Sequence, residues 1–475
     1  MTISRNPRLG MLALALSAAL SGAAFAGPQA ELPRDLPAYG ADKPLPVAQI
    51  EKKTLANGLE VWVVPRDGIP RVDYVLAVRN AGYAADAADA PGFASLFAGL
   101  LAQGTARRDS RAIAETAQSY GGSVGASASN DGVMVYADAL TQHASPMLEL
   151  LAEVARTPSF PDSEVKLAQT NALQALKAAE AQPAFKANRA LLAATYGDHP
   201  YARTQQTEAS ITGVTPAALR QAHALRFHPD RALLVVTGRI EPAEAFALAE
   251  KAFGDWAAAG AEAPETPAAP RQAAPTRLLI QRDGSVQSTV RLGRPAIPAT
   301  DPDYVPAVLA GTVLGGGFSS RVNQNLREDK GYTYGASAGF APARMGGRVQ
   351  AGADVRNEVT GAALQEFFGE FKRLADEPVP EQELLDTKRY VAGGYLISNQ
   401  LQGAVAATLA SNWLVGLPPE FLANYVPLVR EVDADQVRDI ARKYFDPKDQ
   451  SIIVVGDAAA IADQLKPFGE FRLAE

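Results

Sequence analysis

The chain has 475 residues, of which 47% are hydrophobic and 20% are charged, and its mean hydropathy is −0.07. This composition excludes disordered and fibrous proteins, and the length predicts at least two folded domains. The formal net charge of −7 argues against nucleic-acid binding, because phosphates attract basic proteins. Since the sequence has no cysteine, disulfides, thiolate metal sites and cysteine nucleophiles are excluded.

The first residues have the pattern of a secretory signal peptide. Arg5 and Arg8 precede a short apolar run, and an Ala-x-Ala cleavage pattern ends at Ala26. The run is shorter than the roughly 20 apolar residues that span a membrane. We therefore expect a signal peptide over residues 1–26, cleavage after Ala26, and a periplasmic or secreted mature protein without a membrane span. Residues 27–49 are rich in proline and predict an extended arm.

Two segments resemble each other across the length of the chain. Residues 227–238 and 445–456 both begin with Phe, have Pro two residues later, and end with a β-branched run and Gly. A helical pattern precedes and follows each copy, and an Ala/Pro-rich segment separates the copies. The duplication predicts an N-terminal domain over residues 50–256, a linker over 257–276 and a C-terminal domain over 277–473.

Within the first copy, strands and helices alternate in blocks. Asn57-Gly58 predicts a hairpin turn, and Asp109 or Ser110 predicts the start of a helix. Further elements are expected as strands at 72–79, 123–129 and 133–139 and as helical stretches at 144–156 and 161–195. Hairpin-connected strands favour an α+β fold of two duplicated α/β sandwiches, each a mostly antiparallel sheet flanked by helices, over a doubly wound parallel sheet.

The segment 92–105 predicts a helix with one apolar and one small face. The apolar residues recur with helical spacing: Phe93, Leu96, Phe97, Leu100 and Leu101. The opposite face is expected to hold only small residues: Ser95, Ala98, Gly99 and Ala102. None of these side chains binds a metal ion well or transfers a proton.

This segment resembles the signature of the pitrilysin/insulinase family of zinc metallopeptidases, Gly-x-x-His-x-x-Glu-His-x-x-x-x-Gly-Thr, the motif of the inverted zincins. Gly92, Gly104 and Thr105 occupy the matching positions. The resemblance implies that two zinc-binding His, a general-base Glu and a third ligand should stand at four positions. Those positions are occupied by Ser95, Gly99, Ala98 and Ala175, respectively.

Because catalytic zinc needs three protein ligands and a base, we expect this chain to hold no metal and no other cofactor, and to be inactive alone. His223 and His228 are spaced poorly for one helical face and are interpreted as ordinary histidines. Gly315–Gly317 lacks the Lys-Ser/Thr of a phosphate loop. A formal Gly-x-Ser-x-Gly match at 121–125 precedes a strand, the reverse of a nucleophile elbow.

A second element of the family has counterparts in the C-terminal copy. The sequence Leu326-Arg327, Gly331 and Tyr334 is similar to the family's Leu-Arg-x-x-x-Gly-x-x-Tyr. The resemblance implies that Arg327 and Tyr334 contact the substrate backbone and a developing oxyanion. Without it, one would expect a surface Arg paired with a neighbouring acid and a Tyr that ends a strand. Tyr332 is the less suited candidate.

The resemblance therefore implies a non-catalytic subunit of a heteromeric zinc metallopeptidase, in the simplest case a heterodimer. The partner would be a family member with an intact His-x-x-Glu-His that carries the zinc. This chain would supply substrate-binding Arg327 and Tyr334 for peptide hydrolysis. Two alternatives stay open: a purely structural or scaffolding subunit, and a stand-alone peptide-binding protein.

Overall fold

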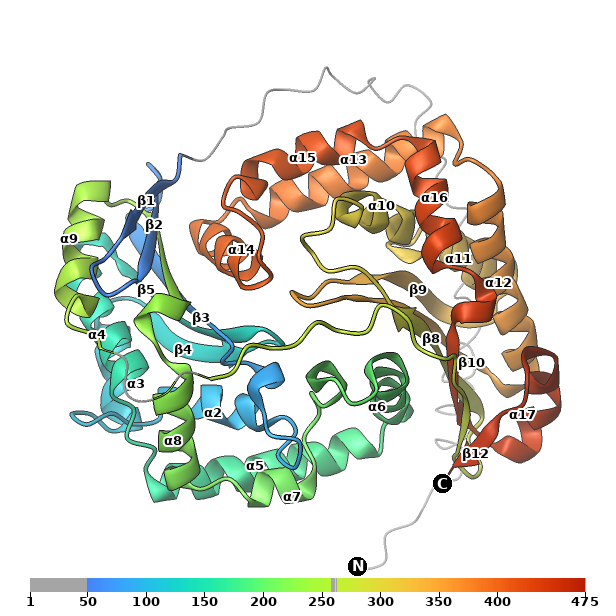
Figure 1. Ribbon diagram of the computed structural model, residues 1–475, viewed down its shortest axis with the longest axis horizontal. Coiled ribbons are helices and arrows are strands. Elements are labelled where there is room, and N and C mark those ends of the chain that lie inside the picture. The colour runs from blue at the N-terminus through green and yellow to red at the C-terminus, as the bar shows by residue number, and fades with distance from the viewer. Residues whose placement is uncertain (1–48, 258–260, 262, 475) are drawn as a thin grey trace, which may run out of the picture. The chain divides into compact units, whose positions relative to one another are not determined.

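The computed structural model describes residues 49–257, 261 and 263–474. The expected signal peptide, 1–26, and all of the arm except Gln49 lie outside the described residues. The described residues belong to one compact unit. Within it, the N-terminal half (residues 49–256) and the C-terminal half (residues 277–474) each contain one six-stranded sheet with helices (Figure 1).

The two sheets share the same order of five strands. The N-terminal sheet contains β1 (Glu51–Thr54), β2 (Glu60–Pro65), β3 (Arg71–Arg79), β4 (Ser123–Ala128), β5 (Gly132–Leu140) and β6 (Ala232–Gly238). The C-terminal sheet contains β7 (Arg277–Gln281), β8 (Gln287–Pro295), β9 (Thr333–Ala341), β10 (Arg348–Arg356), β11 (Ser451–Gly456) and β12 (Arg472–Ala474). Their orders are β1-β2-β6-β3-β5-β4 and β12-β7-β11-β8-β10-β9, so β2 to β6 repeat as β7 to β11.

Most neighbouring strands run antiparallel, as expected, and the α+β fold of two sandwiches is confirmed. The parallel pairs are β2–β6 in the first sheet and β7–β11 and β7–β12 in the second. The Asn57-Gly58 turn joins β1 and β2 as predicted. The order of the strands repeats between the halves because the repeated helix–turn–strand segment contributes β6 to one sheet and β11 to the other.

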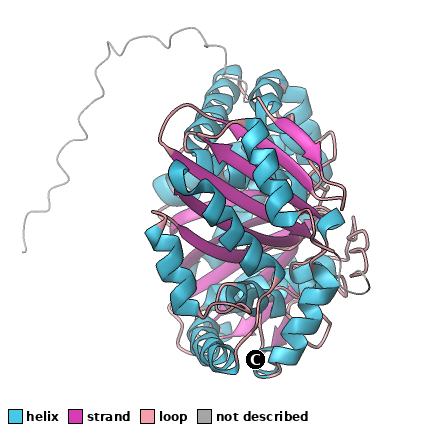
Figure 2. Cartoon of the chain, turned by 90° about the vertical axis from the view of Figure 1, so that its left-hand side faces the viewer, coloured by secondary structure: helices cyan, strands magenta, loops and turns pink. Residues whose placement is uncertain are grey.

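Helices lie over the strands, as Figure 2 shows. Those of the N-terminal half are α2 (Phe93–Leu101), α3 (Ser110–Ser119), α4 (Ala144–Arg156), α5 (Asp162–Glu180), α6 (Pro183–Tyr196), α7 (Glu208–Thr212), α8 (Pro216–Arg226) and α9 (Pro242–Phe253). Those of the C-terminal half are α10 (Tyr304–Gly315), α11 (Arg321–Asn323), the π-helix η5 (Gln324–Asp329), α12 (Thr360–Asp376), α13 (Glu381–Ser398), α14 (Gln402–Leu414), α15 (Phe421–Glu431), α16 (Ala434–Tyr444) and α17 (Ala458–Leu465). No helix among the described residues is both long and apolar enough to cross a bilayer.

Short 3₁₀ turns connect several of these elements. They are η1 (Tyr83–Ala85), η2 (Thr141–His143), η3 (Pro200–Ala202), η4 (Pro229–Arg231), η6 (Asn357–Val359), η7 (Pro447–Asp449) and η8 (Lys466–Phe468). The single helical stretch predicted at 161–195 is wrong: it forms two helices, α5 and α6, separated at Ala181 and Gln182. Pro183 is the first residue of α6, because proline lacks the N–H that a helix interior requires.

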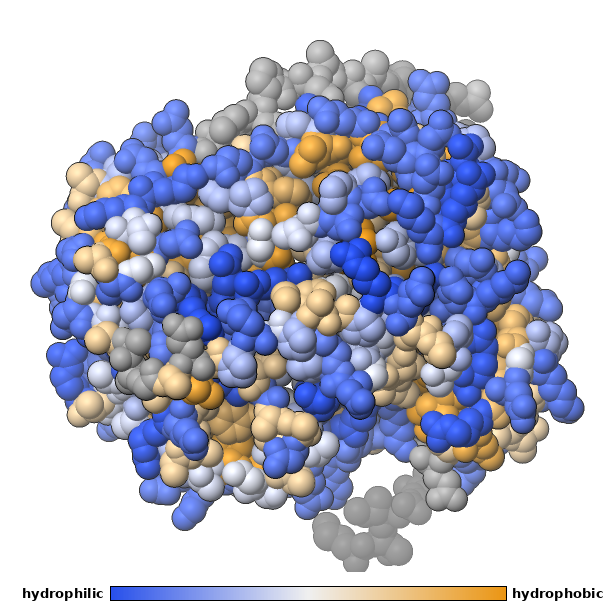
Figure 3. Space-filling model, viewed as in Figure 1, coloured by the Kyte–Doolittle hydropathy of each residue, from blue (hydrophilic) through white to orange (hydrophobic). Residues whose placement is uncertain are grey.

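Each half lends one helix to the sheet of the other. One sheet face of the N-terminal half is covered by α14, whose Val405, Leu409 and Trp413 pack on β2, β3 and β6. Reciprocally, Ala187 and Leu191 of α6 pack on β7 and β11 of the C-terminal sheet (Figure 1). The opposite faces of the sheets form two larger cores with the remaining helices. On the face of the chain seen in Figure 3, hydrophilic residues predominate and apolar residues form separate patches.

Candidate functional site

The helix that carries the motif, α2, is fixed at its start by two features of the sequence. Gly92 has φ +72°, and a Cβ there would lie 2.6 Å from Cγ of Gln206, so both conformation and space require glycine. The carboxylate of Asp86 accepts the backbone N–H of Ala94 at 3.0 Å. An acidic group at this end also stabilises the positive end of the helix dipole.

Under this helix, Asp86 pairs with a buried arginine. Nη2 of Arg226 lies 3.0 Å from Oδ1 of Asp86. The guanidinium also lies 5.3 Å and 5.6 Å from the ring centres of Phe93 and Phe97 of α2. Burial raises the pKa of Asp86 to about 6, although Arg226 opposes the shift. Polar and aromatic contacts thus position α2 through side chains of this chain alone.

The end of the motif has a structural role as well. The hydroxyl of Thr105 donates a hydrogen bond to the buried carboxylate of Glu153 in α4. Glu153 also pairs with Arg107, at 2.7 Å, and with Arg108. The Gly-Thr end of the motif therefore anchors the loop after α2 to α4, which explains its presence in a chain without the zinc-binding residues.

The structure brings together two of the four positions at which the resemblance implies catalytic groups. Ser95 and Gly99 are exposed and line a small cavity between α2 and α5. Its volume is about 250 Å³, and Gln103, Glu164, Leu167 and Asn171 are among its other lining residues. The wall of this cavity offers one hydroxyl, one carboxylate and two amides, but no imidazole.

The other two positions lie elsewhere. Ala98 has an exposed fraction of only 1% and belongs to the N-terminal core, so the expectation that it shares an exposed small face is wrong. Its side chain packs inward because α2 is buried over more of its circumference than the spacing of its large residues indicates. Ala175 is exposed on α5 and does not line the cavity.

These residues do not fit zinc. A hydroxyl, a hydrogen and a methyl group stand where three ligands are needed, and a buried methyl group stands where a base is needed. Within the described part of the chain, no three His, Asp or Glu side chains lie close enough to share a metal ion. We therefore derive no metal chemistry from this helix.

The histidines have structural partners. Nε2 of His223 lies 2.7 Å from the carbonyl oxygen of Ala155, and its ring stacks on Phe227 at 4.9 Å. Burial lowers the pKa of His223, which favours the neutral ring. Nε2 of His228 lies 3.1 Å from the carbonyl oxygen of Ala224. Both rings thus serve the packing of α8 and the turn that follows it.

Arg327 lies on η5 and remains partly accessible. Its side chain is 35% exposed and lies 3.4 Å from the carboxylate of Glu328. Its guanidinium also lies 4.9 Å from the ring centre of Phe318, which is itself 77% exposed. An exposed ion pair of this kind is worth about 1 kcal/mol or less, so Glu328 competes weakly with another acceptor.

Tyr334 is the second residue of β9, one of the two edge strands of the C-terminal sheet. It is 93% exposed, and its hydroxyl contacts no hydrogen-bond partner among the described residues. The ring of Tyr334 does not take part in the packing of the described chain and is available for contact with another molecule. Tyr332 is partly buried and packs against the C-terminal core.

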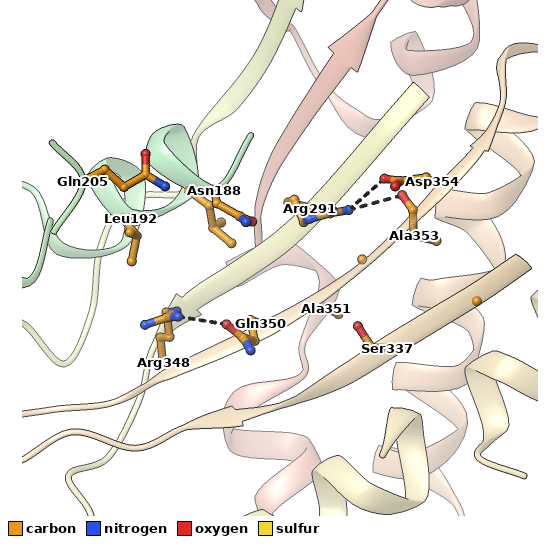
Figure 4. Close-up of a pocket in the computed structure, with 13 residues that line it drawn as sticks. Asn188, Leu192, Gln205, Arg291, Ser337, Arg348, Gln350, Ala351, Ala353 and Asp354 are labelled. Atoms are coloured by element: carbon orange, nitrogen blue, oxygen red, sulfur yellow. Dashed lines mark hydrogen bonds and ion pairs between the residues drawn. The ribbon is translucent and has the colours of Figure 1, made fainter. Parts of the chain in front are cut away.

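The structure also contains a cavity that the sequence analysis missed. It lies between α6 and strands β8, β9 and β10, has a volume of about 510 Å³, and is lined mainly by polar residues (Figure 4). Two segments could have indicated it: Gly335-Ala-Ser337-Ala-Gly339 and Arg348-Val-Gln350-Ala-Gly352-Ala-Asp354 alternate small or polar residues with apolar ones. Such alternation predicts a sheet with one uncovered face.

Comparisons with known proteins match both halves of the chain. Residues 70–207 match the model of the insulinase family, peptidase family M16, and residues 213–391 match that of the peptidase M16 inactive domain. Together these matches cover more than half of the chain. A relative described as an uncharacterized zinc protease, YmxG of Bacillus subtilis, is 26% identical over 73% of this chain and 84% of its own length. The "non-peptidase homolog YmxG" of Helicobacter pylori is 21% identical over 80% of this chain and 88% of its own length.

Solved structures share the fold. A peptidase M16 inactive domain from Pseudomonas fluorescens superposes with a TM-score of 0.81 at 25% identity, and the match covers 87% of this chain and 99% of that one. A protease from Helicobacter pylori superposes with a TM-score of 0.80 at 20% identity, over 86% of this chain and 99% of that one.

Proposed function

The chain belongs to the M16 (insulinase) family of peptidases, and we propose that it is a non-catalytic subunit of a heteromeric zinc metallopeptidase. In this proposal a second family member with an intact His-x-x-Glu-His carries the zinc, and this chain contributes Arg327 and Tyr334 to the handling of a peptide. The similarity to a relative named a non-peptidase homolog supports the lack of catalysis by the chain alone.

The observation that carries the proposal is a contrast between two sites. On α2 and α5, the four positions expected to carry zinc ligands and the general base have side chains that neither bind zinc well nor accept a proton. On the C-terminal half, Tyr334 is almost fully exposed, and Arg327 pairs with an exposed acid and lies near an exposed ring. Both groups are therefore available to a bound peptide.

Each group has a distinct chemical role in this proposal. The guanidinium of Arg327 donates several charged hydrogen bonds to carbonyl oxygens of the bound peptide. The phenol of Tyr334 donates a hydrogen bond to the oxygen that becomes negative when the scissile carbonyl is attacked. A zinc ion held by the partner would supply the activated water. Strand addition to a sheet edge is a common way for such a chain to hold an extended peptide.

Reconstitution with a zinc-bearing family member tests the proposal. The rate of cleavage of a quenched fluorescent peptide is measured for each chain alone and for the mixture, and we expect activity only when the zinc-bearing chain is present together with this one. Tyr334→Phe should lower kcat about 100-fold, the usual effect of removing one oxyanion donor. Tyr332→Phe is the matched control, and it should leave kcat unchanged.

The Arg327→Ala variant separates binding from chemistry. It removes hydrogen bonds to the bound peptide and should raise KM by about tenfold. Unchanged kinetics for both Arg327→Ala and Tyr334→Phe would refute the shared site. If the two chains form a complex but the zinc-bearing chain cleaves the peptide equally fast alone, this chain would instead be a scaffolding subunit.

We also propose that the mature chain is periplasmic or secreted. The signal-peptide pattern at residues 1–26 supports this location. N-terminal sequencing of the protein from its native host should begin at Gly27, and a chain that begins at Met1 in the cytoplasm would refute the proposal.

A further inference from the structure

One face of the C-terminal sheet is apolar at β11 and becomes polar toward the edge strand β9. Ile453 of β11, Arg291 of β8, Gly352 of β10 and Ser337 of β9 are consecutive cross-strand partners, so their side chains share a face. At the β11 end this face is apolar and lies under α6. Toward β9 the same face is polar, no helix covers it in the described chain, and it forms the floor of the cavity of about 510 Å³.

Small residues keep this cavity open. Gly335, Ser337 and Gly352 are among the small residues that line its floor. A Cβ at Gly335 or Gly339 would meet no atom within 4 Å. The edge of the sheet is therefore open above its backbone, while Asn188 and Leu192 of α6 form the opposite wall.

The two arginines of the cavity differ in their partners. Arg291 lies 3.3 Å from the carboxylate of Asp354, as Figure 4 shows. Arg348 donates to Oε1 of Gln350 at 3.0 Å. Among the described residues Arg348 has no carboxylate partner, so no ion pair offsets its positive charge. The cavity therefore carries an excess positive charge in a chain whose net charge is −7.

The amides of the cavity add hydrogen-bond donors. Oε1 of Gln350 accepts from Arg348, and Oε1 of Gln205 accepts from Nε of Arg189 at 3.1 Å. These bonds fix the orientation of both amides, since each carbonyl faces an arginine. Their NH₂ groups donate to no acceptor in the described chain. The wall is consequently rich in donors, whereas the carboxylate of Asp354 is already paired.

We propose that this cavity binds the carboxylate of an acidic side chain in a peptide, with Arg348 as its charged partner. The inference rests on the proposed function in one respect, namely that the chain handles peptides. It adds a preference in sequence: a peptide with Glu or Asp near the uncovered strands binds more tightly than its amide counterpart. A charged hydrogen bond from Arg348, with further donors around the carboxylate, should raise the affinity about tenfold, which corresponds to about 1.4 kcal/mol.

Binding to the chain alone tests this preference without any peptidase activity. The affinity of a fluorescein-labelled peptide of alternating Ala and Glu is measured by anisotropy and compared with that of its Ala/Gln counterpart, both with the full mature chain. We expect the Glu peptide to bind at least tenfold more tightly. Arg348→Gln should reduce the ratio of the two dissociation constants, Ala/Gln peptide over Ala/Glu peptide, to near one. Arg348→Lys should restore part of this ratio. Arg472→Gln, on the opposite edge strand β12 of the same sheet, is the matched control and should leave the ratio unchanged.

Two further measurements make the outcome decisive. Ser337→Trp places a large side chain in the cavity from an exposed position. It should weaken the binding of the Glu peptide and leave the melting temperature of the protein unchanged. Inorganic phosphate at millimolar concentration should not displace the peptide, and full displacement would show a general anion site and overturn the proposal. Equal affinities of the two peptides, or a ratio that survives Arg348→Gln, would also overturn it. The binding experiment leaves Arg327 and Tyr334 unaltered. A failed reconstitution would therefore not affect the measured peptide preference, and a missing peptide preference would not affect the reconstitution.

Discussion

The exchange of helices between the halves predicts that one tryptophan holds a large part of the interface. Trp413 of α14 is only 4% exposed, and the guanidinium of Arg79 in β3 lies 3.6 Å from its ring centre. Its indole N–H donates to Glu60 of β2 at 3.2 Å. These contacts join the C-terminal half to the N-terminal sheet, so Trp413→Ala removes contacts between the halves and few within either.

The size of the effect follows from these contacts. Truncation of a buried Trp to Ala costs about 3–5 kcal/mol, because a large apolar ring is replaced by a cavity. Burial lowers the pKa of Arg79 to about 10, so its guanidinium is still charged at neutral pH. Loss of the ring from this partly desolvated cation adds about 1–2 kcal/mol. We therefore expect the free energy of unfolding to fall by about 5 kcal/mol.

Urea denaturation followed by far-UV circular dichroism measures this loss, and hydrogen exchange locates it. The amides of β3 and β6 should exchange faster in Trp413→Ala, because α14 covers these strands. Trp413→Phe is the matched control: it keeps an aromatic ring over Arg79 and loses the indole hydrogen bond, so it should cost about 1–2 kcal/mol. If the two variants lose equal stability, or Trp413→Ala loses less than about 2 kcal/mol, the assigned role of α14 is wrong.

Two further predictions concern α2. Gly99→Ala should raise the free energy of unfolding by about 1 kcal/mol in urea denaturation, because glycine weakens a helix interior and a Cβ there would meet no atom within 4 Å; a loss of stability would mean that the space at Gly99 is needed. The pKa of Asp86 is raised from 3.8 to about 6, so the folded chain binds this proton more tightly than the unfolded chain. The resulting stabilisation is present below pH 3.8 and is lost as pH rises through 6, which amounts to about 3 kcal/mol. The unfolding free energy of the wild type minus that of Asp86→Asn should fall by this amount between about pH 4 and 7, and a difference that is constant with pH would contradict the assignment.

The sequence predicts those parts of the fold that depend on local patterns. The offset between residues 227–238 and 445–456 is visible because Phe and Pro mark the turn before a strand, and Gly marks the end of that strand, in each copy. The length of a helix is less secure, since the Ala-rich stretch 161–195 keeps a helical pattern across the break before Pro183. Nothing local indicates that α6 and α14 cross to the other half, because an apolar helix face does not specify which of two similar sheets it covers.

The candidate site could be predicted only in part, for a related reason. The identities of Ser95, Gly99, Ala98 and Ala175 follow from the spacing of the motif, but their exposure depends on tertiary packing. Ala98 differs from Gly99 by one position and is nevertheless buried in the core. The donor-rich cavity depends on the pairing of three strands, β8, β10 and β9, which brings Arg291 and Ser337 to one face from segments far apart in sequence.

The contacts of α2 explain how a chain of this family can lose zinc and keep its fold. In a metalloenzyme, ligands on two helices join those helices through the ion, and metal binding contributes to folding. Here the start of α2 is capped by Asp86, its aromatic residues pack on Arg226, and Thr105 fastens the following loop to Glu153. None of these contacts passes through Ser95 or Gly99. Because the helix is held from its buried side, its exposed side is free to change without loss of position.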